Sequence, residues 1–201
     1  MDPEFWNQRF GGETYYYGTA PNEFLAAHAD LIPPGPVLCL GEGEGRNAVF
    51  LAARGHAVTA VDQSSAGLAK ARRLAADRGV ELATTVADLG DFAIPPGAWS
   101  AIVSIFVHLP QPLRRELHRR AAPGLVPGGV FILEGYTPAQ VRFRTGGPVN
   151  QPELLMRLAD LRDELAGLDL LVAREIERDV SEGTTHCGHA AVVQLVARRR
   201  A

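Results

Sequence analysis

The sequence is poor in cysteine and has no long apolar run. Cys39 and Cys187 are the only cysteines among 201 residues, and they lie far apart in the chain. This argues against a disulfide framework and favours a reducing compartment. No stretch approaches the ~18 consecutive apolar residues of a membrane span. The start of the chain also lacks the basic and then apolar segments of a secretory signal. We therefore expect a cytoplasmic protein without a membrane partner.

An excess of positive charge is absent as well. Lys70 is the only lysine, and 20 basic residues stand against 23 acidic ones, which gives a net charge of -3. Such a balance provides no general attraction to nucleic acid, so no nucleic-acid partner is expected. The length suits one domain with a well-buried core. We expect residues 1–201 to form a single domain, present as a monomer or a homodimer.

Short apolar runs alternate with amphipathic stretches between Val37 and Gly135. This alternation is typical of a parallel sheet covered by helices, the doubly wound, Rossmann-like α/β class. Two later β-like stretches, 168–179 and 190–197, have no helix between them and predict an antiparallel hairpin at the sheet edge. The other expected strands are 37–40, 56–62, 80–87, 99–106 and about 130–134. The expected helices are 45–54, 64–79, one from Pro110 through Ala121, and one through Leu154 and Leu165 after a loop at 138–152.

A glycine-rich turn follows the first expected strand, which ends at Leu40. Three glycines at alternate positions, followed by a helix, bring backbone N–H groups and a helix N-terminus against a nucleotide-like ligand. A dinucleotide site needs its third glycine at position 46, where this chain has Arg46. The two acidic residues between the glycines would also repel a diphosphate. The spacing favours a nucleoside cofactor without a pyrophosphate, and its glycines are Gly41, Gly43 and Gly45.

Two further strand ends carry carboxylates. Asp62 ends the second expected strand and precedes Gln63, whereas Asp88 and Leu89 follow the third. The Asp62 carboxylate can accept hydrogen bonds from both ribose hydroxyls. The Asp88 carboxylate can accept from an adenine amine while the N–H of Leu89 donates to the ring. For either aspartate alone, a helix cap or a loop carboxylate explains the residue equally well, but their common register predicts one crevice.

These segments resemble, in order, the motifs of the class I S-adenosylmethionine-dependent methyltransferases. Within that superfamily, the Gly-Arg-Asn-Ala start of the helix and the segment Tyr17–Asn22 resemble the tellurite-resistance methyltransferase-like group. The resemblance covers nearly the whole chain. It implies S-adenosylmethionine as the cofactor and a seven-stranded sheet whose last strand is antiparallel. The segments that carry it at the superfamily level are Val37–Asn47, Ala60–Ser64, Ala87–Leu89 and Leu125–Gly129.

The same resemblance divides the chain by role. Residues 37–135 would form the cofactor-binding half, about 6–31 an N-terminal lid, and 136–201 the acceptor side with its loop, helix and terminal hairpin. The aromatic lid would bring Arg9 and Tyr17 near the methionine carboxylate, although a helix packed on the core is an alternative. Met1–Phe5 resembles a cloning remnant, and we place no functional residue there. The expected cofactor-binding residues are Arg9, Tyr17, Gly41, Glu42, Gly43, Gly45, Arg46, Asp62, Gln63, Asp88, Leu89 and Ile105.

The first strand departs from the usual pattern of the superfamily. An acidic residue usually stands two positions before the first glycine, where this chain has Cys39. Cysteine often follows that glycine, where this chain has Glu42. Our hypothesis is that Glu42 helps to position the amino-acid portion of the cofactor.

An acceptor pocket is expected beyond the fourth and fifth strands. His108 and Tyr136 are the candidate catalytic residues, needed as a base only if the acceptor must lose a proton. A loop histidine satisfied by the backbone is the simpler explanation of His108. Phe106 would bind the acceptor, and Arg142 and Arg144 would close over an anionic one. Solvated surface arginines are an equal alternative for the last two.

A small-molecule acceptor is favoured because only a lid and one loop are available to build an acceptor site. The resemblance allows metalloid oxyanions such as tellurite or selenite, thiols, or another small nucleophile. An NAD(P)-dependent oxidoreductase and a non-catalytic S-adenosylmethionine-binding module are the competing functions. No metal is expected, because the segment 186–189 has two histidines and a cysteine but no second cluster to complete a zinc site.

Overall fold

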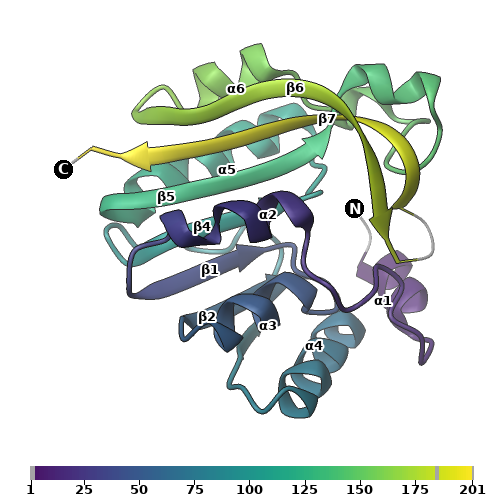
Figure 1. Ribbon diagram of the computed structural model, residues 1–201. Coiled ribbons are helices and arrows are strands. Elements are labelled where there is room, and N and C mark those ends of the chain that lie inside the picture. The colour runs from purple at the N-terminus through teal and green to yellow at the C-terminus, as the bar shows by residue number, and fades with distance from the viewer. Residues whose placement is uncertain (1–2, 184–185, 201) are drawn as a thin grey trace.

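One mixed sheet forms the centre of the protein. The computed structural model describes residues 3–183 and 186–200. The strands are β1 (Pro36–Leu40), β2 (Ala57–Asp62), β3 (Ala83–Val86), β4 (Trp99–Ile105), β5 (Leu125–Tyr136), β6 (Leu168–Glu182) and β7 (His186–Arg199). They form a seven-stranded sheet in the order β3-β2-β1-β4-β5-β7-β6 (Figure 1). Strands β1 to β5 are parallel, and β7 is antiparallel to both β5 and β6. The predicted fold class and the terminal hairpin are therefore confirmed.

Helices cover both faces of the sheet (Figure 1). They are α1 (Pro3–Phe10), α2 (Glu23–His28), α3 (Arg46–Ala53), α4 (Ser65–Asp77), α5 (Gln111–Gly124) and α6 (Leu158–Glu164), with 3-10 turns at Ala29–Leu31, Pro138–Arg142 and Pro152–Leu154. Successive side chains of a strand point to opposite faces. Val37 and Cys39 accordingly pack in the apolar cluster of α2, α3 and α4. Leu38 and Leu40 pack in the cluster of α5 and α6. Burial on both faces explains the continuous apolar run of β1.

Several element boundaries differ from the sequence prediction, and strands β5, β6 and β7 are longer than expected. Strand β3 begins at Ala83 instead of position 80, because the N–H of Val80 donates to the Ala75 carbonyl and completes the end of α4. Helix α6 begins only at Leu158. The N–H of Met156 donates to the Tyr136 carbonyl at 2.8 Å, which holds the preceding segment extended beside β5. A local bond at the end of α4 therefore shortens the expected strand, and a long-range backbone bond overrides the local helical pattern before Leu158.

Helix α3 and helix α4 approach closely at the end of the glycine turn. Gly45 caps α3 in the left-handed conformation, with φ at +92°. A Cβ at this position would lie 2.6 Å from the Cα of Ala71 in α4. Gly45 therefore serves helix packing and is not among the residues that line the candidate site, and its contact with the cofactor stays a prediction. Ser64 caps α4, since its hydroxyl accepts from the N–H of Gly67 at 3.0 Å.

None of the helices within residues 3–183 and 186–200 is long and apolar enough to cross a membrane.

Replacing Gly45 with alanine tests this close approach, and Gly55→Ala is the matched control. Gly55 has nearly the same φ, +90°, but no atom beyond its chain neighbours lies within 4 Å of where a Cβ would stand. We expect Gly55→Ala to lower the free energy of unfolding by about 1–2 kcal/mol through backbone strain alone. Gly45→Ala should lose about 1–3 kcal/mol more because the added methyl overpacks the contact with Ala71. Equal losses in urea unfolding would contradict this interpretation.

Candidate active site

A cavity of about 420 Å³ lies at the carboxyl ends of β1, β2 and β4. Its volume falls within the range of about 300–1,000 Å³ that is typical of small-molecule sites. It brings together residues from widely separated stretches of the chain, including the N-terminal segment and the hairpin tip. The predicted site residues that line it are Arg9, Tyr17, Gly41, Glu42, Gly43, Arg46, Asp62, Gln63, Asp88, Leu89, Ile105, Phe106 and His108.

Asp62 is bonded to the glycine turn. One carboxylate oxygen accepts from the N–H of Gly43 at 2.8 Å, and the other accepts from the N–H of Ser64 at 2.7 Å. Burial raises the pKa of Asp62 above its usual value, and these backbone bonds oppose the rise. An ionised carboxylate has about four acceptor sites, so capacity is left for a ligand hydroxyl. The carboxylate therefore fixes the turn and still presents an acceptor to the cavity.

Asp88 has a looser environment on the next strand end. Its side chain is exposed, lines the cavity and accepts from the N–H of Gly90 at 2.7 Å. The following Leu89 is buried, and Arg120 donates to its carbonyl at 2.8 Å. This places a carboxylate and an apolar side chain side by side at the same edge as Asp62.

Glu42 lies at the start of α3. Its Oε1 accepts from the N–H groups of Asn47 and Ala48 at 2.9 and 2.8 Å. Burial raises the pKa of Glu42 to about 7, although these bonds and the Arg46 charge oppose the shift. Burial and the adjacent Glu42 carboxyl also raise the pKa of the Cys39 thiol. Cys39 and Glu42, the two residues that depart from the usual motif, are therefore spatial neighbours. A carboxyl group remains at this end of β1.

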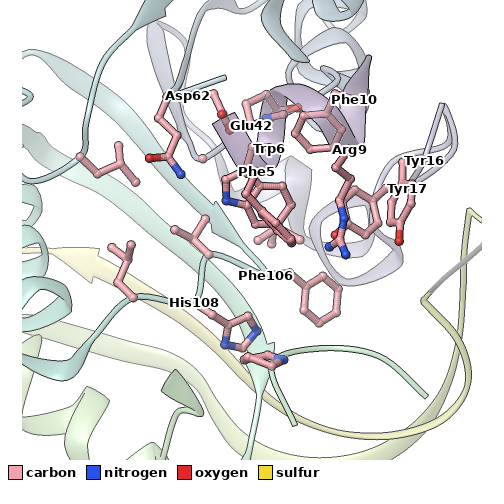
Figure 2. A pocket seen from close by; sticks show the side chains of 18 of the residues that line it. Phe5, Trp6, Arg9, Phe10, Tyr16, Tyr17, Glu42, Asp62, Phe106 and His108 are labelled. Carbon is pink, nitrogen blue, oxygen red and sulfur yellow. Dashed lines mark hydrogen bonds between the residues drawn. The ribbon is translucent and has the colours of Figure 1, made fainter. Parts of the chain in front are cut away.

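The N-terminal segment folds over the glycine turn (Figure 2). In α1, Asn7 accepts from the Ser64 hydroxyl at 2.8 Å and from the N–H of Ala66 at 3.2 Å. The N–H groups of Tyr16 and Tyr17 donate to one Glu44 oxygen at 2.7 and 3.3 Å. These contacts anchor the aromatic segment to the cofactor-binding half at both of its ends.

Four further residues of this segment, Phe5, Trp6, Phe10 and Tyr16, line the cavity. The Arg9 guanidinium lies 4.8 Å from the ring centres of both Phe5 and Tyr16. Phe5 is 48% exposed and lines the cavity together with Trp6. Our expectation that the first five residues contribute nothing to the site is therefore wrong for Phe5. The sequence could not reveal this, because only the placement of α1 turns the Phe5 ring toward the cavity.

His108 lines the cavity with both ring nitrogens near backbone partners. Nδ1 lies 3.1 Å from the Leu154 carbonyl, and Nε2 accepts from the N–H of Tyr136 at 3.4 Å. This arrangement requires the proton on Nδ1. Burial lowers the pKa of His108 to about 4, so its imidazole is neutral at physiological pH. The geometry matches a histidine satisfied by the backbone, and a catalytic role for it stays a prediction.

Tyr136 lies behind the cavity wall. Its side chain is 1% exposed, and its ring packs 4.7 Å from that of Phe106 and 5.6 Å from that of His108. Burial raises the pKa of its hydroxyl. Tyr136 is not among the residues that line the cavity, and its catalytic role stays a prediction. Phe106, which does line it, adopts a positive φ of 55°.

Arg142 and Arg144 do not line the cavity either. The 3-10 turn at Pro138–Arg142 directs Arg142 toward β6, where it pairs with Glu177 at 2.6 Å on the surface. Arg144 is also exposed. The loop reaches the cavity through its next residues, Gly146, Gly147 and Pro148. Both arginines thus lie on the surface in this structure, and a role in closing over an anionic acceptor stays a prediction.

His186 is a cavity residue that the sequence reasoning missed. It is 7% exposed, and its ring lies 4.5 Å from that of Tyr17 and 4.9 Å from that of Phe106. Burial, together with the nearby Arg46 charge, lowers its pKa to about 3. The sequence pattern raised His186 only as a zinc ligand, and the described residues contain no group of three metal-ligating side chains. Its position at the tip of the predicted hairpin was the available signal.

Arg46 lines the cavity from the first turn of α3. Its side chain is largely buried, and Nη2 donates to Glu182 at 2.6 Å. Among the residues that the structure describes, no side chain or backbone group bonds to Nη1, which is also buried. A buried cationic donor without a partner, next to a cavity, fits an anionic ligand group.

Comparison with known proteins agrees with this geometry. Residues 37–129 match the family model of a methyltransferase domain. The 2-heptyl-1-hydroxyquinolin-4(1H)-one methyltransferase of Mycobacteroides abscessus is 31% identical over 125 residues, which cover 60% of this chain and 55% of that relative. The chain thus spans about half the length of the curated relative it matches.

Solved structures show the same fold. The structure reported for conversion of a disulfide bond into a thioacetal group during echinomycin biosynthesis has a TM-score of 0.77 and 21% identity, covering 99% of this chain and 90% of that chain. TehB from Haemophilus influenzae has a TM-score of 0.74 and 17% identity, covering 98% of this chain and 67% of that chain. The domain match over residues 37–129, the strand-end motifs and the fold together support a class I S-adenosylmethionine-dependent methyltransferase.

Proposed function

We propose that the whole chain acts as one S-adenosylmethionine-dependent methyltransferase domain on a small-molecule acceptor. The observation that carries this proposal is the convergence of three strand ends on one cavity. Gly43, Asp62 and Asp88 line the same space, and the N-terminal segment covers it. The activity requires such a site, because methyl transfer needs in-line approach of the two reactants and exclusion of water.

The residues present fit the cofactor of this family. Gly41 brings no side chain into the space at the end of β1, where a Cβ would lie 2.8 Å from the side chain of Val107 in the cavity wall. In our proposal Asp62 accepts from the ribose hydroxyls, and Asp88 accepts from the adenine amine. The unpartnered Nη1 of Arg46 offers a cationic donor for the methionine carboxylate. When bound, S-adenosylmethionine supplies a methyl group already activated for displacement.

The acceptor side of the cavity is walled mainly by rings. Trp6, Phe106, His108 and His186 line it, and the two histidines are neutral at physiological pH because burial lowers the pKa of each. Flat aromatic molecules pack well against such walls. We therefore favour an aromatic hydroxyl compound as the acceptor. This agrees with the hydroxyquinolone named for the Mycobacteroides relative. The motifs that resemble the tellurite-resistance group keep metalloid oxyanions and thiols as the next classes to test.

The other features of the proposal follow from the sequence. The net charge of -3 gives no attraction to nucleic acid. We propose a cytoplasmic enzyme that acts as a monomer or homodimer on diffusible acceptors.

A turnover screen tests the proposed activity. S-adenosylhomocysteine formation should appear with phenols or hydroxyquinolones, and more slowly or not at all with tellurite, selenite, thiols and amines. The physical reason is the neutral ring lining, which binds flat apolar molecules better than hydrated oxyanions. Turnover with oxyanions alone would overturn the preferred acceptor class. Thermal stabilisation by NAD(P) but not by S-adenosylhomocysteine would favour an oxidoreductase instead. Cofactor binding without turnover of any acceptor would favour a binding module.

A second test concerns Glu42 and the pH dependence of cofactor binding. The pKa of this carboxyl is about 7 in the folded protein, above its ordinary 4.5, so protonation begins near neutral pH. A cofactor ammonium group favours the ionised carboxylate. Binding below pH 7 must then release a proton, and affinity should fall by up to about tenfold per pH unit as the pH drops from 7.

Calorimetry with S-adenosylhomocysteine from pH 5.5 to 8 measures this slope. The Glu42→Gln variant controls for titration of the ligand itself and should show a weaker slope below pH 7, with lower affinity at pH 8. Identical slopes and affinities in the two proteins would eliminate the proposed role of Glu42.

A further inference from the structure

The tip of the β6–β7 hairpin is tied to the glycine-turn helix by a buried carboxylate. Glu182, the last residue of β6, is 4% exposed and does not line the cavity. One of its oxygens accepts from Arg46 Nη2 at 2.6 Å, and the other accepts from the Asn22 amide at 2.7 Å. Both oxygens of Glu182 are therefore directed by bonds from two other parts of the chain.

Glu182 belongs to a larger buried polar network. The Asn22 amide also donates to Glu134 in β5 at 2.6 Å, and Arg178 donates to Glu134 through two nitrogens at 2.9 and 2.8 Å. The network thus contains the carboxylates of Glu134 and Glu182 and the guanidinium groups of Arg46 and Arg178, and Arg178 also pairs with the exposed Glu23 at 3.1 Å. Buried networks of this kind are stable only when their members are satisfied. The one buried guanidinium nitrogen left without a partner among the described residues of the network is Arg46 Nη1.

The two motifs that resemble the tellurite-resistance group meet in this network. Asn22 ends the N-terminal motif, and its N–H donates to the side chain of Asn47 at 2.9 Å. Asn47 follows Arg46 in the helix motif. The side chain of Arg46 is long and flexible, so its direction depends on its bonding partners. The only ion pair of Arg46 among the described residues is the one with Glu182.

We propose that Glu182 is a positioning residue that holds Arg46 with its free Nη1 directed at the carboxylate of the cofactor's amino-acid portion. This inference rests on the proposed function. It makes the hairpin, which lies outside the segment 37–129 that matches the methyltransferase domain, a contributor to cofactor binding. Glu182 acts through Arg46 and touches no ligand itself.

The test compares two ligands by calorimetry. S-adenosylhomocysteine carries the amino-acid portion, whereas 5′-methylthioadenosine has the same adenosine and thioether without it. In Glu182→Gln, affinity for S-adenosylhomocysteine should fall by about tenfold or more, because a charge-assisted bond that orients Arg46 is lost. Affinity for 5′-methylthioadenosine should change by less than about twofold. If Glu182 had a merely structural role, Glu182→Gln would lower the affinity for both ligands alike.

Three variants sharpen the comparison. Glu177→Gln, on the same strand but in a surface pair with Arg142, is the matched control and should bind both ligands as the wild type does. In an Arg46→Gln background, adding Glu182→Gln should leave the ratio of the two affinities unchanged, since Glu182 then has nothing to position. If Glu182→Gln does not fold, Glu182→Asp keeps the charge with a shorter reach and should give an intermediate ratio.

An unchanged ratio in Glu182→Gln, or an equal loss for both ligands, would overturn the inference. So would a further change of the ratio in the Arg46→Gln background. Failure of the wild-type protein to bind S-adenosylhomocysteine would instead count against the proposed function, which separates the two failures.

Discussion

The buried pairing of Arg46 with Glu182 connects the parts of the protein on which the site depends. It joins the first turn of α3 to the end of β6, and Asn22 brings the N-terminal segment to the same carboxylate. Removing one partner of a buried ion pair typically costs about 3–5 kcal/mol, because the other charge stays buried without compensation. The hairpin, the glycine turn and the N-terminal segment are therefore energetically linked, and the cavity lies between them.

Enclosure of the cavity depends on this linkage more than on any single wall. Two backbone N–H groups of the N-terminal segment donate to Glu44, and the side chain of Asn7 in α1 accepts from a backbone N–H at the start of α4. The hairpin tip packs against the same segment, since a Cβ on Gly183 would lie 2.3 Å from the Tyr16 carbonyl. The two backbones approach so closely that no side chain fits between them. This explains the glycine at position 183, with its φ of +67°. The cavity is therefore lined by segments near opposite ends of the chain.

Electrostatics within the cavity separate two regions. Near the strand ends, the carboxyl groups of Glu42, Asp62 and Asp88 face the space assigned to the cofactor. On the acceptor side, burial keeps His108 and His186 neutral. The exchange of Cys39 and Glu42 relative to the usual motif preserves this division, because the two side chains are neighbours and the carboxyl stays at the end of β1. The carboxyl group of Glu42, which follows the first glycine, thus occupies the region that an acidic side chain at position 39 of β1 would reach.

The sequence by itself determined the sheet, its strand-end motifs and the terminal hairpin, because these depend on local periodicity and on residue types at fixed spacing. It identified Asp62, Asp88 and the glycine turn for the same reason. The sequence predicted Tyr136, Arg142 and Arg144 at the cavity, but none of the three is among the residues that line it. His186 and Phe5 line the cavity and were not predicted. Only the tertiary structure decided these positions, since the direction of a side chain outside the strand-end motifs depends on long-range contacts. The burial of Glu182 beside Arg46 is the clearest case: 136 residues separate the two, and no local pattern relates them.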